Sequence, residues 1–130
     1  MASSKVCVVV VSGTLERLQM AAMVASVAAV SGQEVLVFLS MNAMSYFVKG
    51  NQDKAPHEGE MGALMAGKKV PEFKTLFEQA VELGDAKIFP CSMAMDVLGV
   101  EQDGMEGYLE QATGLTKFLH DAQDGQVWTF

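Results

Sequence analysis

The chain has 130 residues, half of them hydrophobic, and this suffices for one domain over residues 1–130 with a core of its own. Its formal net charge is −7 and it contains no basic run, which argues against nucleic acid or an anionic membrane as a partner. The two cysteines lie far apart, residues 1–5 lack a secretory-signal pattern, and the longest apolar stretch, residues 18–30, is shorter than the roughly 20 residues that cross a bilayer. We therefore expect a cytoplasmic protein.

The first third of the chain predicts a strand, a long helix and a second strand. Residues 5–12 are rich in valine and apolar on both faces, as in a parallel sheet that is covered on both sides. Thr14 is the expected N-cap of a helix over residues 16–31. Because Ala, Val, Met and Leu dominate this helix, we expect it to be buried almost all round, against the sheet and against another subunit. Residues 34–40 form the second buried strand, and a short helix over residues 43–48 follows.

The middle of the chain contains one long connection and then the third strand. Residues 51–70 are polar, contain glycine and show no clear period, so we expect a loop, and long loops in compact domains are often functional. Pro71 begins a helix over residues 72–83, which has one apolar stripe. A third strand over residues 86–89 then leads through a turn into a short helix over residues 93–98.

The last part predicts a fourth strand over residues 105–110, an amphipathic helix over residues 114–122 and a final strand over residues 126–130. This alternation of strands and helices predicts an α/β fold with a mostly parallel sheet and helices on both faces. The order of the strands stays open between 2-1-3-4-5 and 4-3-2-1-5.

Cys91 is the one notable nucleophile at the predicted strand ends. In open α/β sheets, ligands and catalytic groups gather at the carboxyl ends of the strands. Cys91 also precedes a helix, where unpaired backbone N–H groups and the helix dipole favour a thiolate. The first strand order places it beside Ser12 and Gly13, and the second places it beside residues 40–42. The candidate site residues are therefore the catalytic Cys91 and the binding residues Ser92, Met93, Ala94, Ser12, Gly13 and Asn42.

Other chemistries of cysteine and methionine fit the sequence less well. A thioredoxin motif needs a second cysteine where Ala94 stands, and a rhodanese loop is closed by an arginine at the spacing that Asp96 occupies. A Cu(I) site that uses Met93 and Met95 is a further hypothesis, although these side chains project from different sides of a helix. Cys7 lies between valines in the first strand, where a buried structural role is expected.

The segment Gly84–Val100, GDAKIFPCSMAMDVLGV, resembles the DsrE/DsrF-like group of sulfur-relay proteins. The shared pattern is a helix that ends in glycine, a short strand, and a cysteine followed by a helix of the Ser-Met-Asp-Leu-Gly type. Residues 114–119 and the closing apolar strand over residues 127–130 are also similar to that family. The resemblance implies a three-layer α/β/α domain with a five-stranded parallel sheet, assembled as a homotrimer or homohexamer.

The resemblance also implies that Cys91 accepts sulfane sulfur as a persulfide and passes it to a partner thiol on a TusA-like or other sulfur-carrier protein. The first hypothesis is thus a sulfur carrier or sulfurtransferase without a metal or organic cofactor. A persulfide is an anion at neutral pH, and the N–H groups of Met93 and Ala94 are suited to hold its terminal sulfur. The alternative hypothesis is a non-catalytic, homo-oligomeric binding or structural subunit in which Cys91 is incidental.

Overall fold

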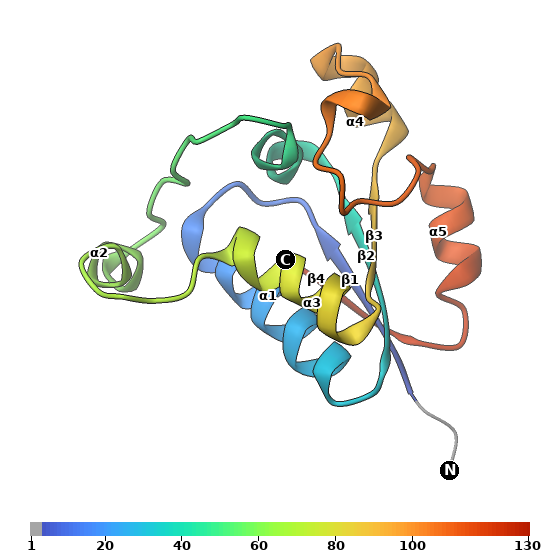
Figure 1. Cartoon of the computed structure of the whole chain (residues 1–130), viewed down its shortest axis with the longest axis horizontal. Helices are drawn as coiled ribbons and strands as arrows, with labels where there is room; N and C mark the ends of the chain where they lie inside the picture. Colours follow the sequence, from blue (N-terminus) through green and yellow to red (C-terminus); the bar gives the residue numbers. More distant parts are fainter. Residues whose placement is uncertain (1–3) are drawn as a thin grey trace.

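The computed structural model describes residues 4–130, so residues 1–3, the start of the segment without a secretory-signal pattern, lie outside the described part. The described residues form a four-stranded sheet in the order β3-β2-β1-β4, in which all neighbouring strands are parallel. Figure 1 shows α1 and α3 on one side of this sheet and α5 on the other. Within residues 4–130, no helix is both long and apolar enough to span a membrane.

The elements follow one another in the predicted order, with two additional short helices and without the predicted strand over residues 105–110. Their bounds are β1 (Lys5–Val10), α1 (Leu15–Val30), β2 (Glu34–Leu39), the 3-10 helix η1 (Met41–Phe47), α2 (Glu60–Ala66), α3 (Phe73–Gly84), β3 (Lys87–Pro90), α4 (Ser92–Leu98), the 3-10 helix η2 (Gln102–Gly104), α5 (Leu115–Asp121) and β4 (Gln126–Thr129). Four predicted strands and the helices before and after Cys91 are confirmed, with ends that differ by at most two residues.

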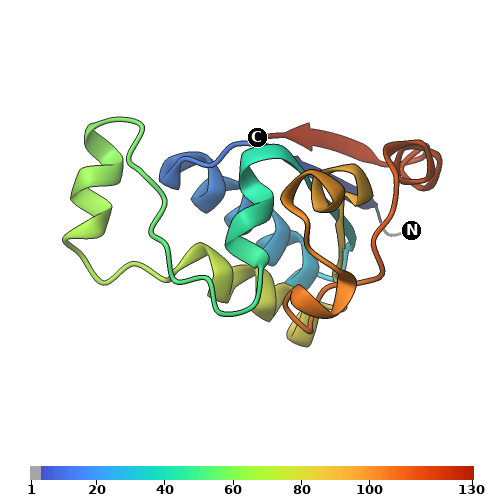
Figure 2. The same cartoon turned by 90° about the horizontal axis from the view of Figure 1, so that it is seen from above.

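Helices enclose the sheet because its strands are apolar on both faces. On one face, α1 packs small residues against the strands, and α3 packs beside α1. On the other face, Phe118 of α5 lies against Phe38 of β2, with ring centroids 5.1 Å apart. Gly84 ends α3 so close to α1 that a Cβ there would fall 2.5 Å from the Cβ of Ala29. The predicted layers of helix, sheet and helix are visible from above in Figure 2.

In the single chain, α1 is buried on one side only. Its exposed side carries a stripe of Met20, Met23, Val27 and Val30, of which Val27 is 65% exposed. This is the side on which the sequence predicts a contact with another subunit. The opposite side is mainly alanine and is buried. Because both sides of the helix are apolar, its sequence shows little amphipathic pattern.

The predicted fourth strand over residues 105–110 is not formed, so the five-strand count is not confirmed. That segment is irregular backbone. Glu110 donates a backbone hydrogen bond to β3 (2.8 Å), and the N–H of Thr113 donates to the carbonyl oxygen of Pro90 (3.0 Å). One isolated parallel bridge joins Thr113 to Cys91. The chain thus runs beside β3 at residues 110–113 without completing a ladder.

The connection over residues 51–70 was expected to lack regular structure, and this expectation is wrong because the segment contains α2. Of this helix only Gly62 is buried, while Met61 and Leu64 are exposed. A helix that buries no apolar stripe leaves no periodic pattern to detect. In Figures 1 and 2, α2 stands out from the main body of the molecule.

Candidate functional site

Cys91 lies at the carboxyl end of β3, between β2 and the segment that carries Thr113. Its N–H donates to the carbonyl oxygen of Leu39 in β2 (2.9 Å), and the bridge to Thr113 lies on the other side. Cys91 is also the N-cap of α4, since its carbonyl oxygen accepts a hydrogen bond from the N–H of Met95 (3.0 Å). The residue is 5% exposed, so the single chain nearly encloses it.

The strand order decides which strand end is the neighbour of Cys91. Because β3 pairs with β2, with Pro90 opposite Leu39, Cys91 lies beside Ser40. This agrees with the second of the two expected orders. The end of β1 lies one strand further away, on the far side of β2.

Ser12, Gly13 and Asn42 form a group at the ends of β1 and β2. A Cβ at Gly13 would fall 3.0 Å from the Cβ of Asn42, so the two backbones are in close contact and a larger residue at position 13 would separate them. The hydroxyl of Ser12 lies 3.0 Å from the hydroxyl of Thr14 and accepts the Thr14 N–H (3.2 Å). The Ser12 side chain is therefore engaged with Thr14, and Asn42 is the predicted residue of this group on the strand next to Cys91.

Met41 is a residue of this region that the sequence did not single out. It follows the end of β2 with a φ of 51°, in the left-handed region that non-glycine residues rarely adopt. The backbone on each side of it is fixed, because the N–H groups of Ser40 and Asn42 donate to the end of β1 at 3.0 and 3.1 Å. Strained backbone of this kind gathers at functional sites. A methionine in the sequence does not indicate a left-handed backbone conformation, so the sequence could not predict this feature.

The first turn of α4 contains the remaining predicted residues. The N–H of Ser92 donates to the carbonyl oxygen of Thr113 (3.0 Å) and is thereby occupied. The N–H groups of Met93 and Ala94 have no hydrogen-bond partner among residues 4–130. In the same turn, the side chain of Met93 is half exposed and that of Ala94 is buried. Thr113, which fixes this turn, was not predicted.

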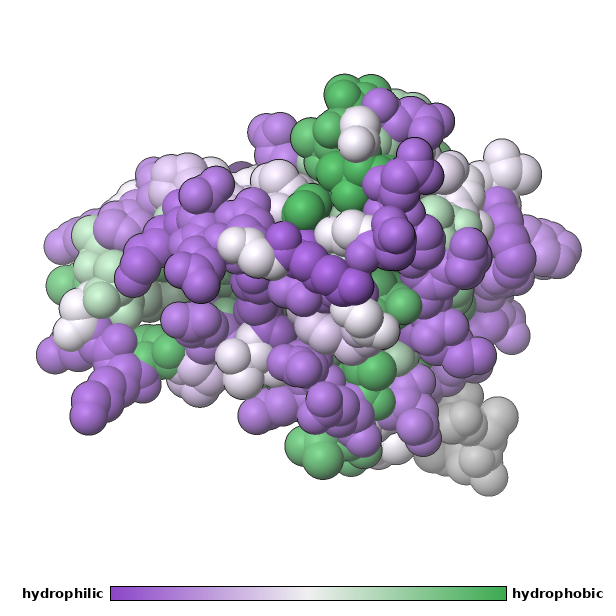
Figure 3. Space-filling model, turned by 45° about the horizontal axis from the view of Figure 1, so that its top comes forward, coloured by the Kyte–Doolittle hydropathy of each residue, from purple (hydrophilic) through white to green (hydrophobic). Residues whose placement is uncertain are grey.

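An exposed apolar surface surrounds the site. Figure 3 shows hydrophobic side chains gathered at the top of the molecule, over α4. The exposed members near the ends of β2 and β3 are Met41, Met93, Val97 and Leu98, and Val97 is 78% exposed. Contiguous exposed apolar patches mark interaction sites in many proteins.

Cys7 and the larger cavities lie elsewhere. Cys7 is fully buried in the middle of β1, and burial raises the pKa of its thiol, which keeps it in the unreactive neutral form. Two cavities, of about 990 and about 640 Å³, are lined by residues other than Cys91. Among residues 4–130, no three His, Cys, Asp or Glu side chains are grouped so that they could hold a metal ion.

Comparison of the chain with known proteins gives a matching family and several similar folds. The family model that matches is that of the DsrE/DsrF/DrsH-like family, over residues 51–130. A search of curated proteins finds no match.

Among solved structures, the ychN protein from E. coli has a TM-score of 0.71 at 15% sequence identity, over 99% of this chain and 100% of that chain. MTH1491 from Methanobacterium thermoautotrophicum, described as a protein of unknown function, has a TM-score of 0.66 at 8% identity, over 98% and 100% of the two chains. These likenesses concern the fold.

The family match covers α2 and every later element, including β3, Cys91 and α4, and it confirms the resemblance that the sequence around Cys91 indicates. This chain belongs to the DsrE/DsrF/DrsH-like family.

Proposed function

We propose that this protein is a sulfur carrier or sulfurtransferase that holds sulfane sulfur as a persulfide on Cys91. The observation that carries the proposal is the position of Cys91 at a strand end and at the N-cap of α4, in a chain of the DsrE/DsrF/DrsH-like family. Cys7 is unsuited to the role because it is buried within β1.

The chemistry needs only one thiol on this chain. The Cys91 thiolate attacks the outer sulfur of a donor persulfide, the sulfur–sulfur bond of the donor breaks, and the donor leaves as a thiolate. A partner thiolate then attacks the outer sulfur on Cys91 and restores the Cys91 thiolate. No electrons are gained or lost overall. The N–H groups of Met93 and Ala94 are suited to stabilise the outer sulfur while it is an anion.

The second thiol would come from another chain, such as a TusA-like or other sulfur-carrier protein. The apolar surface around Met93, Val97 and Leu98 supports this part of the proposal, because a partner that covers it would bring its own thiol to the end of β3.

Mass spectrometry of the intact protein after incubation with polysulfide tests the proposal. We expect the wild type and Cys7→Ser to gain the mass of one or more sulfur atoms, which a thiol reductant removes, and Cys91→Ser to gain none. Addition to Cys91→Ser, or no addition to the wild type, would contradict the proposal.

The exposed stripe of α1 supports a second candidate function, a non-catalytic subunit of a homo-oligomer. In that case the same experiment gives no sulfur adduct, while the assembly stays intact in both the wild type and Cys91→Ser.

A further inference from the structure

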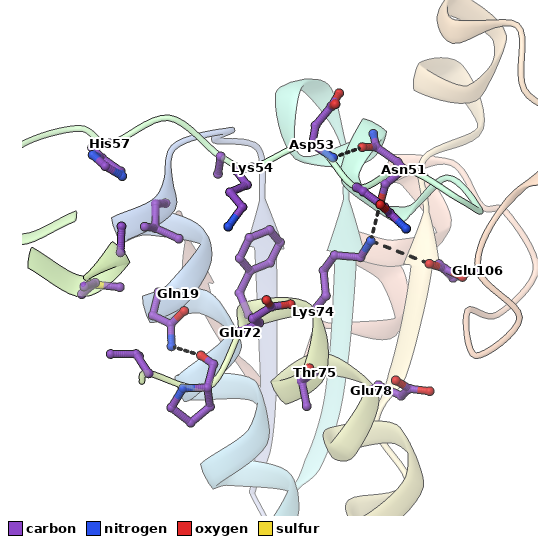
Figure 4. A pocket seen from close by; sticks show the side chains of 18 of the residues that line it. Gln19, Asn51, Asp53, Lys54, His57, Glu72, Lys74, Thr75, Glu78 and Glu106 are labelled. Carbon is purple, nitrogen blue, oxygen red and sulfur yellow. Dashed lines mark hydrogen bonds and ion pairs between the residues drawn. The ribbon is translucent and has the colours of Figure 1, made fainter. Parts of the chain in front are cut away.

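A cavity of about 990 Å³ lies apart from Cys91, between the start of α3 and the segment over residues 51–70, which we call the strap. Figure 4 shows the strap above the cavity, α3 below it and Gln19 of α1 at its side. Its size falls at the upper end of the roughly 300–1,000 Å³ that is typical of small-molecule sites. It is therefore a candidate binding site that the sulfur chemistry does not use.

Specific hydrogen bonds hold the strap in place, so the cavity wall is preformed. The amine of Lys74 on α3 donates to the carbonyl oxygen of Asn51 (3.0 Å), and the side chain of Asn51 accepts the N–H of Asp53 (2.7 Å). Further along, the carboxylate of Glu16 accepts three backbone hydrogen bonds, at 2.7, 2.7 and 3.0 Å. Their donors are Glu58, Gly59 and Gly62.

Gln19 presents an unused acceptor to the cavity. The residue is 7% exposed, and its amide nitrogen donates to the carbonyl oxygen of Pro71 (2.9 Å). Its amide oxygen accepts no hydrogen bond from residues 4–130 and faces the cavity in Figure 4. No buried side-chain oxygen or nitrogen of residues 4–130 lacks a partner, so this oxygen is open to water in the free chain, and a donor on a ligand can replace that water.

Lys54 and Glu72 add one charge of each sign to the same space. Figure 4 shows the amine of Lys54 pointing into the cavity from the strap and the carboxylate of Glu72 pointing into it from α3. Lys54 forms no ion pair within the described residues, and Glu72 makes no side-chain capping bond to α3. The buried ring of Phe73 and the partly buried Leu15 supply apolar surface between them.

The overall charge of the lining excludes a polyanion such as a nucleotide. Three lysines line the cavity against five carboxylates, and one of the lysines, Lys74, already lies 3.8 Å from Glu106. The carboxylates are Asp53, Glu72, Glu78, Glu82 and Glu106. A ligand with a single negative charge and a compensating ammonium group is the complement of such a lining.

We propose that the cavity binds an α-amino acid or a short peptide with a hydrophobic side chain. The ligand carboxylate pairs with Lys54, and its ammonium group donates to the amide oxygen of Gln19 and to Glu72. The hydrophobic side chain packs on Phe73 and Leu15. Each of the unused polar groups then has a partner.

Amide NMR spectra of the full, isotope-labelled chain test this proposal with defined probes. L-leucine and L-leucylglycine are expected to shift the amides of residues 51–55, 57 and 72–75. N-acetyl-L-leucine lacks the ammonium group and L-leucinamide lacks the carboxylate, so each is expected to bind at least about tenfold more weakly than L-leucine. Equal binding of the capped probes, or no shift with either zwitterion, would overturn the proposal.

Two matched substitutions of exposed lysines locate the site. Lys54→Met is expected to weaken L-leucine binding about tenfold, while Lys87→Met, which lies outside this cavity, leaves it unchanged. Because both lysines are exposed, both variants are expected to fold, and unchanged amide shifts outside the substituted region check this. Undiminished binding to Lys54→Met would place the ligand elsewhere and refute the assignment.

Discussion

The two thiols of the chain show how position within one sheet separates a core residue from a reactive candidate. Cys7 lies in the middle of β1, paired with β2 on one side and β4 on the other, and is fully buried. Cys91 is also enclosed, but it lies where a strand ends and a helix begins. We therefore expect that local opening at the strand end is enough to expose Cys91, whereas exposure of Cys7 requires the sheet to open.

This contrast predicts different alkylation behaviour. In Cys91→Ser the remaining thiol is Cys7, and burial raises the pKa of that thiol as well as blocking access. We expect iodoacetamide to modify it more slowly in the folded protein than in guanidinium by a factor of about 10³ or more, because reaction then waits for unfolding. In Cys7→Ser the remaining Cys91 is expected to react without unfolding. Equal protection of the two thiols, measured by mass spectrometry over time, would contradict this.

Gly84 predicts a second effect at the scale of single residues. The Cβ of Gly84→Ala would fall 2.5 Å from the Cβ of Ala29 and 2.6 Å from its backbone carbon, so α1 and α3 must move apart. We expect a loss of about 1–3 kcal/mol in the free energy of unfolding, which exceeds the gain of up to about 1 kcal/mol from the better helix propensity of alanine. Gly107→Ala is the control, since nothing lies within 4 Å of its added Cβ. Urea unfolding curves that coincide for the two variants would show that the helices tolerate the side chain.

At the scale of elements, the attachment of α2 depends on one carboxylate. The N–H of Glu58, followed by those of Gly59 and Gly62, lowers the pKa of the Glu16 carboxyl from its ordinary 4.5 to about 2. Since α2 buries only Gly62, few apolar contacts replace these bonds when they are lost. The helix is thus tied to α1 chiefly by electrostatics.

The lowered pKa fixes the direction of a pH effect. A carboxyl whose pKa is lower in the folded than in the unfolded state stabilises the folded state at pH values above its unfolded pKa, which is about 4.5 for Glu16. This contribution is lost as the pH falls from 4.5 to about 2. We expect Glu16→Gln to raise amide hydrogen exchange in α2 at neutral pH while exchange in α1 and α3 changes little. The wild type should show the same local increase only when the pH approaches 2. Unchanged exchange in the variant would show that α2 is held by other contacts.

Gly62→Ala tests the same attachment from the side of α2. An added Cβ would fall 2.6 Å from the Glu16 carboxylate and displace it, whereas at Gly67 the nearest atom is 3.7 Å away. We expect Gly62→Ala to match Glu16→Gln in hydrogen exchange, and Gly67→Ala to behave as the wild type. The opposite ranking would contradict the role of Glu16.

These elements also show which parts of the structure a sequence determines locally. The valine-rich strands, the glycine after α1 and the apolar stripe of α3 are local patterns, and they predict the order of strands and helices. The pairing of β3 with β2 and the bonds from α2 to Glu16 join residues more than 40 positions apart, and no local pattern carries them. Cys91 and its helix were therefore predictable, while the contact of Thr113 with Cys91 and the strained backbone of Met41 were not.

At the scale of the whole molecule, two further exposed apolar surfaces of residues 4–130 bear on association, besides the one over α4. The stripe of α1 is one, and β4 at the edge of the sheet is the other, with Val127 and Trp128 each 48% exposed. An edge strand with apolar side chains is a ready site for association between chains. We infer that these surfaces take part in association between copies of this chain, and the homotrimer or homohexamer stays a prediction.

An interface built on α1 can be tested at one exposed position with little effect on the fold. Val27 is 65% exposed, so Val27→Asp removes no core contact but places a charge in the α1 stripe. We expect the wild type to have a mass that is a multiple of 14.0 kDa by native mass spectrometry, and Val27→Asp to have the mass of a single chain. Met61→Asp, on the equally exposed surface of α2, is the matched control and is expected to keep the assembly.

Trp128, the one tryptophan of the chain, gives an independent signal. If β4 lies in the contact, the emission of Trp128 should shift to longer wavelength when the assembly dissociates. A wild type that is a single chain at micromolar concentration, or a Val27→Asp variant that still assembles, would contradict an interface built on α1.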